Sequence, residues 1–411
     1  MACGRMPGIA LSILAALTAS VQSASGTPLY SYPGAIHIHT VYSDGSGTVE
    51  EIVQAAKDAG LSFIVLSDHN TLEPLQKGYE RYWDDLLVLV GVEISTDKGH
   101  CLTMGVSADF DWGSTAPQNV IDRVNAAGGI AILAHPVSVR WQWQDWSVQG
   151  YHGLEIINLA SLVDDDIRSA AHDMPVDPAA VRRLGQLSKR YIANPRSVMT
   201  TITNNTVGPE RARWDELLRS GRRVVGIASV DAHARVPVGG QEFKVPTYRE
   251  AFDSVQTYIV TRMPLTGDLT RDRRLVYDAI REGRAYMVYP LMAPSPGFRF
   301  TATEGDNQVL MGEKLKLQKQ AKIVVEAPDH RRPVIRLLKD GEEIATEYGP
   351  RLEWTCQSPG VYRAEVYVRR SSGPVFDLRR GLRLPSVSDL LRSRTRDIRP
   401  WIFSNPIYVR G

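Results

Sequence analysis

The sequence predicts an α/β fold: a β/α barrel of seven strands followed by a small antiparallel β-sandwich. Residues 35–288 alternate short apolar runs with polar or helix-like stretches, as a parallel α/β fold does. From residue 295 onward the runs are short and alternating, with Gly and Pro between them, which is typical of an antiparallel sandwich. The 411 residues, 43% of them hydrophobic, suffice for one large and one smaller domain. We therefore expect a barrel over 34–290 and a sandwich over 295–411.

Seven apolar runs are the predicted strands of the barrel. They cover residues 35–39, 63–66, 86–92, 102–106, 130–134, 154–157 and 224–228. Apolar residues at helical spacing predict helices between and after these strands, over 49–59, 119–127, 250–257 and 275–282. Residues 161–215 are polar and mixed, and we expect this segment to be an insertion that covers one face.

The predicted sandwich contains several short strands and one unusual segment. Its strands are expected over 298–301, 321–327, 334–338, 352–354, 360–368 and 406–409. Asp340-Gly341 is a hairpin-turn pair between two of them. An arginine-rich insertion around 379–399 is interpreted as a solvated loop or helix, with a surface for an anionic ligand as the alternative.

The N-terminal residues and the net charge bear on export and on possible partners. Residues 1–25 combine Arg5, an apolar run and a small-residue site, and so resemble a secretory signal peptide; an uncleaved anchor is the alternative. We expect an exported, periplasmic or extracellular protein whose mature chain does not span a membrane. A net charge of +2 gives no strong signature of nucleic-acid binding. Cys101 and Cys356 are too few to form a disulfide framework.

Histidines and carboxylates follow the predicted strands in a repeated placement. His37 and His39 are two apart on one strand, so both rings should project to the same side. Further candidates follow later strands, where the carboxyl ends of parallel strands meet at one face. The predicted metal ligands are His37, His39, Asp44, His69, Glu93, His100, His135, Asp231 and His233.

Six imidazoles and three carboxylates are more ligands than one tetrahedral ion uses. The set suits two or three divalent ions with a bridging carboxylate, and the absence of thiolates leaves manganese, zinc and iron open. Metal-bound hydroxide is then the expected nucleophile. His152, Arg140, Arg196 and Arg213 are candidates for substrate contacts.

The motifs around these ligands resemble, in their order, those of the polymerase and histidinol phosphatase (PHP) superfamily, over residues 34 to about 290. They are His37-Ile38-His39-Thr40, Tyr42-Ser43-Asp44-Gly45, Ser67-Asp68-His69-Asn70, Gly91-Val92-Glu93-Ile94, Gly99-His100, Ala134-His135-Pro136 and Asp231-Ala232-His233. The resemblance implies a distorted seven-stranded barrel. The β-domain and the ending Trp401-Ile402-Phe403-Ser404-Asn405-Pro406-Ile407-Tyr408 resemble the branch that includes the carbaryl hydrolases.

The resemblance also implies how the ligands are shared. His37, His39, Glu93 and Asp231 would hold a first ion. Glu93 would bridge to a second ion held by His100 and His135. The remaining ligands, Asp44, His69 and His233, would hold a third.

Three functions follow from these observations. The first is a phosphoesterase that acts on a small or nucleotide-like phosphate ester, with a nucleotide or short oligonucleotide as candidate substrate. The second keeps the metal site but hydrolyses a carbamate, carboxylic ester or amide. The third is a catalytically inert glycan- or wall-binding protein that works through its β-sandwich.

Overall fold

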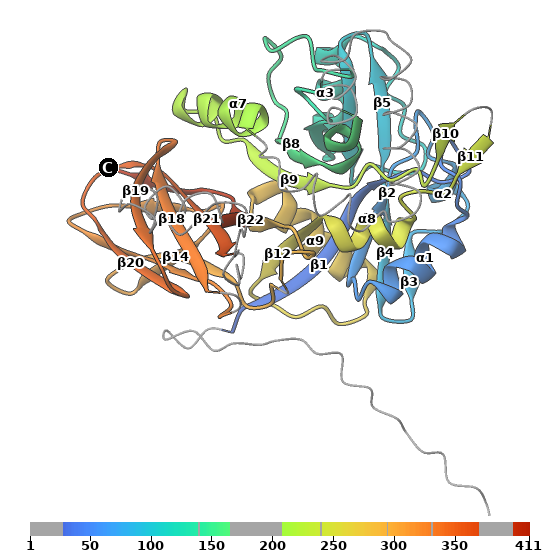
Figure 1. The fold of residues 1–411 in the computed structure, drawn as a ribbon. Coiled ribbons are helices and arrows are strands. Elements are labelled where there is room, and N and C mark those ends of the chain that lie inside the picture. The colour runs from blue at the N-terminus through green and yellow to red at the C-terminus, as the bar shows by residue number, and fades with distance from the viewer. Residues whose placement is uncertain are drawn as a thin grey trace, which may run out of the picture.

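The computed structural model describes residues 28–138, 140–164, 208–238, 241–293, 295–329, 332–369 and 398–411. The predicted signal peptide, Arg196 and residues 379–397 of the arginine-rich segment lie outside these residues. The described chain is a mixed α/β structure. In Figure 1 the C-terminal strands lie at one end of the molecule, and β2, β4 and β5 lie toward the other.

The strands that follow the predicted barrel pattern divide between two sheets. The larger sheet contains β1 (Tyr30–Ile38), β2 (Phe63–Leu66), β3 (Arg81–Trp83), β4 (Leu86–Val90), β12 (Gln256–Thr261) and β13 (Ala285–Val288), in the order β13-β12-β1-β2-β4-β3. The smaller sheet contains β5 (Val92–Thr96), β6 (Gly99–Met104), β7 (Ile130–Leu133), β8 (Gly153–Asn158) and β9 (Val225–Ser229), in that order. A separate hairpin pairs β10 (Val236–Val238) with β11 (Gln241–Phe243).

The predicted strand over 86–92 is in fact two strands, β4 and β5, which belong to different sheets. Gly91 stands at the break, where its N–H donates to the carbonyl of Leu66 at 2.7 Å. A Cβ on Gly91 would lie 2.3 Å from the carbonyl oxygen of Thr103, so the close approach of the backbones there requires glycine.

The expected closed barrel of seven strands is not confirmed. In the described part of the chain, isolated bridges join the two sheets, between Ile38 and Ala232 on one side and between His69 and Glu93 on the other. The strands are also not all parallel, because β6 runs antiparallel to both β5 and β7. The seven predicted runs therefore surround one site without forming one closed ladder.

The helices begin and end at recognisable signals. They are α1 (Val49–Asp58), α2 (Glu73–Gln76), α3 (Pro117–Ala126), α7 (Gly208–Arg219), α8 (Tyr248–Ser254) and α9 (Leu269–Glu282). Thr48 and Glu51 form a capping box at α1, and Gly283, with φ 76°, ends α9 as expected from the sequence. α1 packs against α8 (Figure 1), and α3 packs on β6 and β7. No helix among the described residues is long and apolar enough to cross a membrane.

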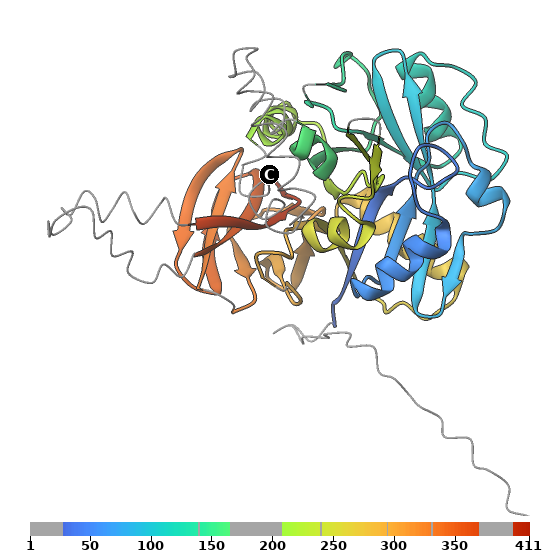
Figure 2. The same ribbon diagram turned by 45° about the vertical axis from the view of Figure 1, so that its right-hand side comes forward.

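The C-terminal strands form two layers (Figure 2). One is an antiparallel sheet of β15 (Asn307–Leu310), β14 (Arg299–Glu304), β17 (Ala321–Glu326) and β20 (Arg351–Cys356), in that order. The other contains β16 (Lys314–Lys316), β18 (Pro333–Lys339), β19 (Glu342–Glu347), β21 (Gly360–Arg369), β22 (Ile398–Ser404) and β23 (Ile407–Arg410). The predicted Asp340-Gly341 hairpin is confirmed, with positive φ at both residues.

The second layer is continuous with the larger sheet, because β22 pairs with β13. Buried Asn405 strengthens this junction. Its side chain accepts a hydrogen bond from Gly226 N at 2.8 Å and donates to the carbonyls of Gly226 and Ala285, each at 2.8 Å. A second tie runs from α7 to β21, where buried Arg363 donates to both carboxylate oxygens of Asp215 at 2.7 and 2.9 Å. The division at residues 290–295 stays a prediction.

Candidate metal centre

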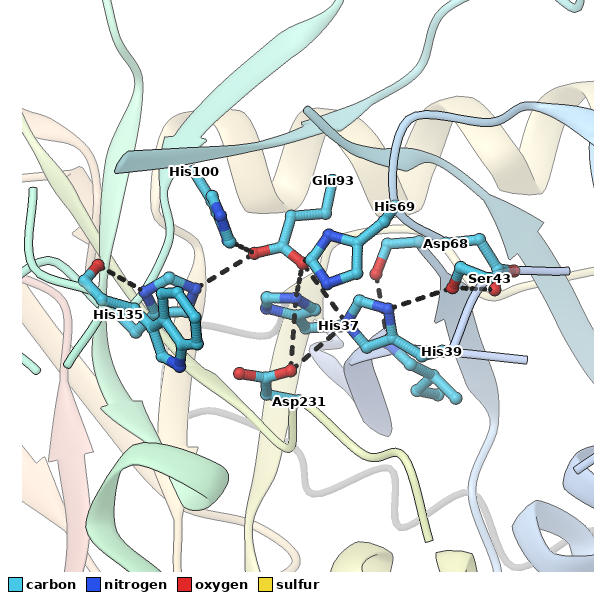
Figure 3. A network of polar contacts seen from close by, with 12 residues as sticks. His37, His39, Ser43, Asp68, His69, Glu93, His100, His135 and Asp231 are labelled. Atoms are coloured by element: carbon cyan, nitrogen blue, oxygen red, sulfur yellow. Dashed lines mark hydrogen bonds and ion pairs between the residues drawn. The ribbon is translucent and has the colours of Figure 1, made fainter. Parts of the chain in front are cut away.

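The nine predicted ligands lie where strands of the two sheets end. His37 is in β1, and His39 and Asp44 follow it; His69 follows β2. Glu93 lies in β5 and His100 in β6, while His135, Asp231 and His233 follow β7 and β9. Figure 3 shows five of the imidazoles arranged around the carboxylate of Glu93. The structure therefore brings the whole predicted set together.

One oxygen of Glu93, Oε2, faces two imidazole nitrogens of the first predicted group. It lies 3.1 Å from His37 Nε2 and 3.3 Å from His39 Nε2. Asp231 Oδ1 lies 3.6 Å and 3.2 Å from the same two nitrogens. Two ligand atoms bound tetrahedrally at about 2.1 Å from one ion would be about 3.4 Å apart. The distances from both nitrogens to each carboxylate oxygen are therefore close to the spacing of ligand atoms in one coordination shell, and His37, His39 and Glu93 all lie within reach of one ion.

The other oxygen of Glu93, Oε1, faces the second predicted group. It lies 2.9 Å from His100 Nδ1 and 3.1 Å from His135 Nε2. One carboxylate thus presents a different oxygen to each group, as a bridging ligand does.

A third group surrounds Asp44. Its Oδ1 lies 3.3 Å from His233 Nε2 and 3.5 Å from His39 Nδ1, while its Oδ2 lies 3.8 Å from His69 Nε2. This group is the most open, since the side chain of Asp44 is 48% exposed and that of His233 is 26% exposed. His37, His39 and Glu93 are buried beneath it.

Several imidazoles are fixed by a hydrogen bond at Nδ1, which leaves Nε2 for the cluster. His37 Nδ1 lies 2.6 Å from Glu155 Oε1, His135 Nδ1 lies 3.0 Å from the carbonyl of Trp141, and His233 Nδ1 lies 3.0 Å from the carbonyl of Asp231. When each Nδ1–H donates to its oxygen, the Nε2 lone pair points at the cluster. Outer contacts of this kind hold metal-binding histidines in one tautomer and orientation.

Glu155, which is fully buried in β8, also belongs to the site, although it is not among the residues predicted from the sequence. Besides His37, its carboxylate accepts hydrogen bonds from His135 N at 2.7 Å and from Asn158 Nδ2 at 2.8 Å. Asn158 Nδ2 also lies 3.2 Å from Asp231 Oδ2. A carboxylate inside the apolar run Leu154-Glu155-Ile156-Ile157 was the available signal, because a buried charge needs partners.

Three buried nitrogens of the cluster have no hydrogen-bond partner among the described residues: His37 Nε2, His39 Nε2 and His69 Nδ1. Buried polar atoms are normally satisfied, and all three of these point toward carboxylate oxygens of the same cluster. Divalent cations would satisfy both the nitrogen lone pairs and the carboxylates. The residues present therefore fit a metal centre.

The buried carboxylates of the cluster stabilise positive charge on the groups around them. Burial alone would lower the pKa of His37, but the carboxylates of Asp231 and Glu93 raise it well above its usual value. Burial would likewise raise the pKa of Glu93, but His37 and the neighbouring imidazoles hold it well below its usual value. The carboxylates thus favour cationic neighbours, whether protons or metal ions.

The backbone is strained at three of the ligands. His37, His135 and Asp231 have positive φ values of 71°, 30° and 46°, which side chains other than glycine rarely adopt. At His37 the register of β1 with β2 shifts, so β1 has an irregularity there. The rings of His37 and His39 both face Glu93, as predicted, although a regular strand is not what places them. Such strain concentrates at functional sites.

Of the described residues predicted to contact the substrate, Arg140 lies near the cluster, whereas His152 and Arg213 do not. Arg140 lies beside the cluster, with its guanidinium carbon 4.5 Å from the ring centre of Trp141, whose ring stacks on His100. His152 precedes β8 and accepts a hydrogen bond from Ala131 N at 3.2 Å, at the opposite strand end from the ligands. Arg213 lies on α7, paired with Glu216 and stacked on Trp146. The structure does not bring His152 or Arg213 to the cluster.

Comparison with known proteins points to one domain family. Residues 35–138 match the sequence profile of the PHP domain. Two uncharacterized proteins of Methanocaldococcus jannaschii are similar in sequence. The first is 31% identical over 121 residues, which cover 25% of this chain and 67% of that protein. The second is 30% identical over 122 residues, which cover 24% of this chain and 56% of that protein.

Three solved structures are similar at low TM-scores. A two-domain Bacteroides vulgatus protein containing a PHP-like metal-dependent phosphoesterase has a TM-score of 0.40 at 12% identity, covering 84% of this chain and 92% of that one. A putative metal-dependent phosphoesterase of Bifidobacterium adolescentis has 0.31 at 17% identity, covering 53% and 94%. An amidohydrolase of Chromobacterium violaceum has 0.29 at 14% identity, covering 52% and 92%. TM-scores this low carry no conclusion about function.

Proposed function

This chain belongs to the PHP-domain family, and from that premise we propose that it is a metal-dependent hydrolase and, more narrowly, a phosphoesterase. One observation carries the proposal. Glu93 presents one oxygen to His37 and His39 and the other to His100 and His135, and three imidazole nitrogens of the cluster are buried without a hydrogen-bond partner among the described residues. Imidazole and carboxylate donors of this kind suit a hydrolase that uses divalent ions.

The residues divide into groups that would hold the ions. His37, His39 and Asp231 would hold one ion, His100 and His135 a second, with Glu93 shared between them. Asp44, His69 and His233 would hold a third. Bound there, divalent manganese, zinc or iron supplies Lewis acidity and lowers the pKa of water toward neutrality.

The chain's own residues determine how substrate reaches the centre. Because His37, His39 and Glu93 are buried while Asp44, His69 and His233 are partly exposed, the substrate approaches from the Asp44 side. Glu155 accepts a hydrogen bond from His37 Nδ1 and so holds the proton of His37 on that nitrogen. Asn158 orients both Glu155 and Asp231. These buried contacts hold the ligands in place before the substrate arrives.

A phosphate ester is the substrate class that uses three cation-binding groups most fully, since negative charge develops on several of its oxygens. We propose a small or nucleotide-like phosphate ester. A carbamate, carboxylic ester or amide is the competing substrate for the same centre, as in the carbaryl-hydrolase branch. We also propose that residues 1–25 direct export and that residues 295–411 form a β-sandwich domain.

A double variant and a substrate panel test this function. We expect the His37→Ala, Asp231→Ala protein to lose bound metal and hydrolysis, because His37 faces Glu93 Oε2 and Asp231 faces His37 and His39 in the same predicted ion-binding group. The matched control is His152→Asn with Asp278→Asn, which removes the same residue types outside the cluster and should keep both properties. The panel contains phosphomono- and phosphodiesters, carboxylic esters and carbamates, each assayed with manganese and with zinc.

Three outcomes would contradict the proposal in whole or in part. Full activity of the double variant would show that the cluster is not the catalytic centre. Turnover of carbamates or carboxylic esters without turnover of any phosphate ester would keep the metal centre but reject the phosphoesterase. If the purified protein bound glycan and held no stoichiometric metal, both the metal centre and the phosphoesterase activity would be rejected.

A further inference from the structure

Trp141 contacts both histidines that face Glu93 Oε1. Its backbone carbonyl lies 3.0 Å from His135 Nδ1, and its ring stacks on His100 with 6.1 Å between ring centres and 25° between planes. His100 and His135 come from β6 and from the end of β7. Trp141 is thus a single residue that contacts two ligands of the same group.

The loop that carries Trp141 is anchored independently of the ligands. Trp143, only 2% exposed, packs against Gly99, where a Cβ would come within 2.9 Å of the indole. Gln144 N donates to the carbonyl of Lys98 at 2.7 Å, and Trp143 N donates to the carbonyl of Pro136 at 2.9 Å. These bonds fix the loop against the start of β6, next to His100.

The indole of Trp141 is 48% exposed, although a large apolar ring is normally buried. Its two well-defined neighbours are His100 and the guanidinium of Arg140. The neighbouring Trp143 supplies the buried anchor, so the exposed ring is not needed to hold the loop. Contact with the ligands accounts for its position.

We propose that Trp141 is a positioning residue for the ion-binding group of His100 and His135. Its carbonyl keeps the His135 proton on Nδ1, so that Nε2 is free toward Glu93, and its ring limits the rotation of His100. The proposal rests on the proposed function in that it assigns a metal to this group. It predicts that Trp141 controls the affinity of one ion and leaves the ion of His37, His39 and Asp231 unaffected.

The test compares four proteins as full chains: wild type, Trp141→Ala, Trp141→Phe and Trp146→Ala. Trp146 is the matched control, because it lies in the same loop region but stacks on Arg213. Manganese and zinc titrations should show one ion losing affinity by about 10–100-fold in Trp141→Ala, the usual effect of removing an outer contact of a metal ligand. Trp141→Phe should restore most of that affinity, and Trp146→Ala should match wild type.

A second readout does not depend on metal. Proton–nitrogen NMR of the metal-free protein reports the ring tautomer of His135 and the mobility of the His100 ring. The His135 ring should be Nδ1-protonated in wild type and in Trp141→Ala alike, because the substitution keeps the backbone carbonyl, whereas the His100 ring should become more mobile in Trp141→Ala. Wild-type ion affinity together with unchanged mobility of the His100 ring in Trp141→Ala would overturn the proposal, as would a His135 ring that is not Nδ1-protonated in wild type or an equal loss of affinity in Trp146→Ala. A wild-type protein that binds no ion would contradict the proposed function instead, and the mobility of the His100 ring would then decide the role of Trp141.

Discussion

Glu155 offers a sharp test of how the centre is held, because its role depends on the hydrogen bonds that both carboxylate oxygens accept and not on the size of the side chain. The carboxylate accepts three hydrogen bonds, from His37 Nδ1, His135 N and Asn158 Nδ2, at 2.6, 2.7 and 2.8 Å. Glu155→Gln keeps the shape but replaces one oxygen by an NH₂ group. If the remaining oxygen faces His37, the NH₂ faces two donors, those of His135 and Asn158.

The magnitude follows from this mismatch. A buried donor left without an acceptor costs about 1–3 kcal/mol, so two such donors should lower the free energy of unfolding by roughly 2–6 kcal/mol. The same substitution weakens the orientation of His37, a contact whose loss typically costs about 10–100-fold in metal affinity. Both effects should appear together, since one carboxylate serves both functions.

The assay is urea unfolding of the metal-free protein together with manganese titration of the folded protein. The control is Glu216→Gln, which changes a 61% exposed carboxylate on α7 and should shift the free energy of unfolding by no more than about 0.5 kcal/mol. If Glu155→Gln unfolded at the wild-type urea concentration and bound manganese with wild-type affinity, our account of Glu155 would be wrong.

Two further predictions concern stability away from the ligands. Asn405→Ala leaves Gly226 N without its side-chain acceptor and the Gly226 carbonyl without its side-chain donor, whereas the Ala285 carbonyl keeps the backbone N–H of residue 405 at 3.3 Å. It should lower the free energy of unfolding by about 3 kcal/mol, and an unchanged urea midpoint would contradict this role of Asn405. Burial and the charge of Arg281 lower the pKa of His152 to about 4. The stability contributed by its neutral ring is therefore complete above about pH 6.5 and lost as the pH falls toward 4. Metal-free wild type should lose more stability than His152→Asn between about pH 7 and pH 4.5 in thermal melts, and equal losses would contradict this assignment.

The sequence could predict which residues meet, because ligand-type residues after successive apolar runs converge wherever the strands share one end. It could not predict the sheet topology. The run over 86–92 has no polar interruption, and the break at Gly91 depends on a contact with the Thr103 carbonyl from a different strand. The antiparallel pairing of β6 with β5 and β7 likewise depends on short connections that apolar runs do not encode.

The outer contacts were harder to predict than the ligands. Glu155 lies inside an apolar run, where its partners come from β1, the end of β7 and the end of its own strand. His152 was a misleading candidate because it precedes its strand, which places it at the strand end opposite the ligands. The positive φ at His37 has no signature in residue type, since histidine adopts it here only under tertiary constraint.

The two isolated bridges between the sheets have a mechanical consequence. Both lie beside ligands: one joins Ile38 to Ala232, and the other joins His69 to Glu93. His37, His39, Asp44 and His69 belong to the larger sheet or follow its strands, whereas Glu93, His100, His135, Asp231 and His233 belong to the smaller sheet or follow its strands. Backbone hydrogen bonds such as Val230 N to Ile36 O at 3.0 Å and Asn70 N to Glu93 O at 3.0 Å also cross between the sheets. An ion bound by residues of both sheets would add metal–ligand bonds to these backbone contacts, so the stability of the contact between the two sheets would depend on whether the metal is bound.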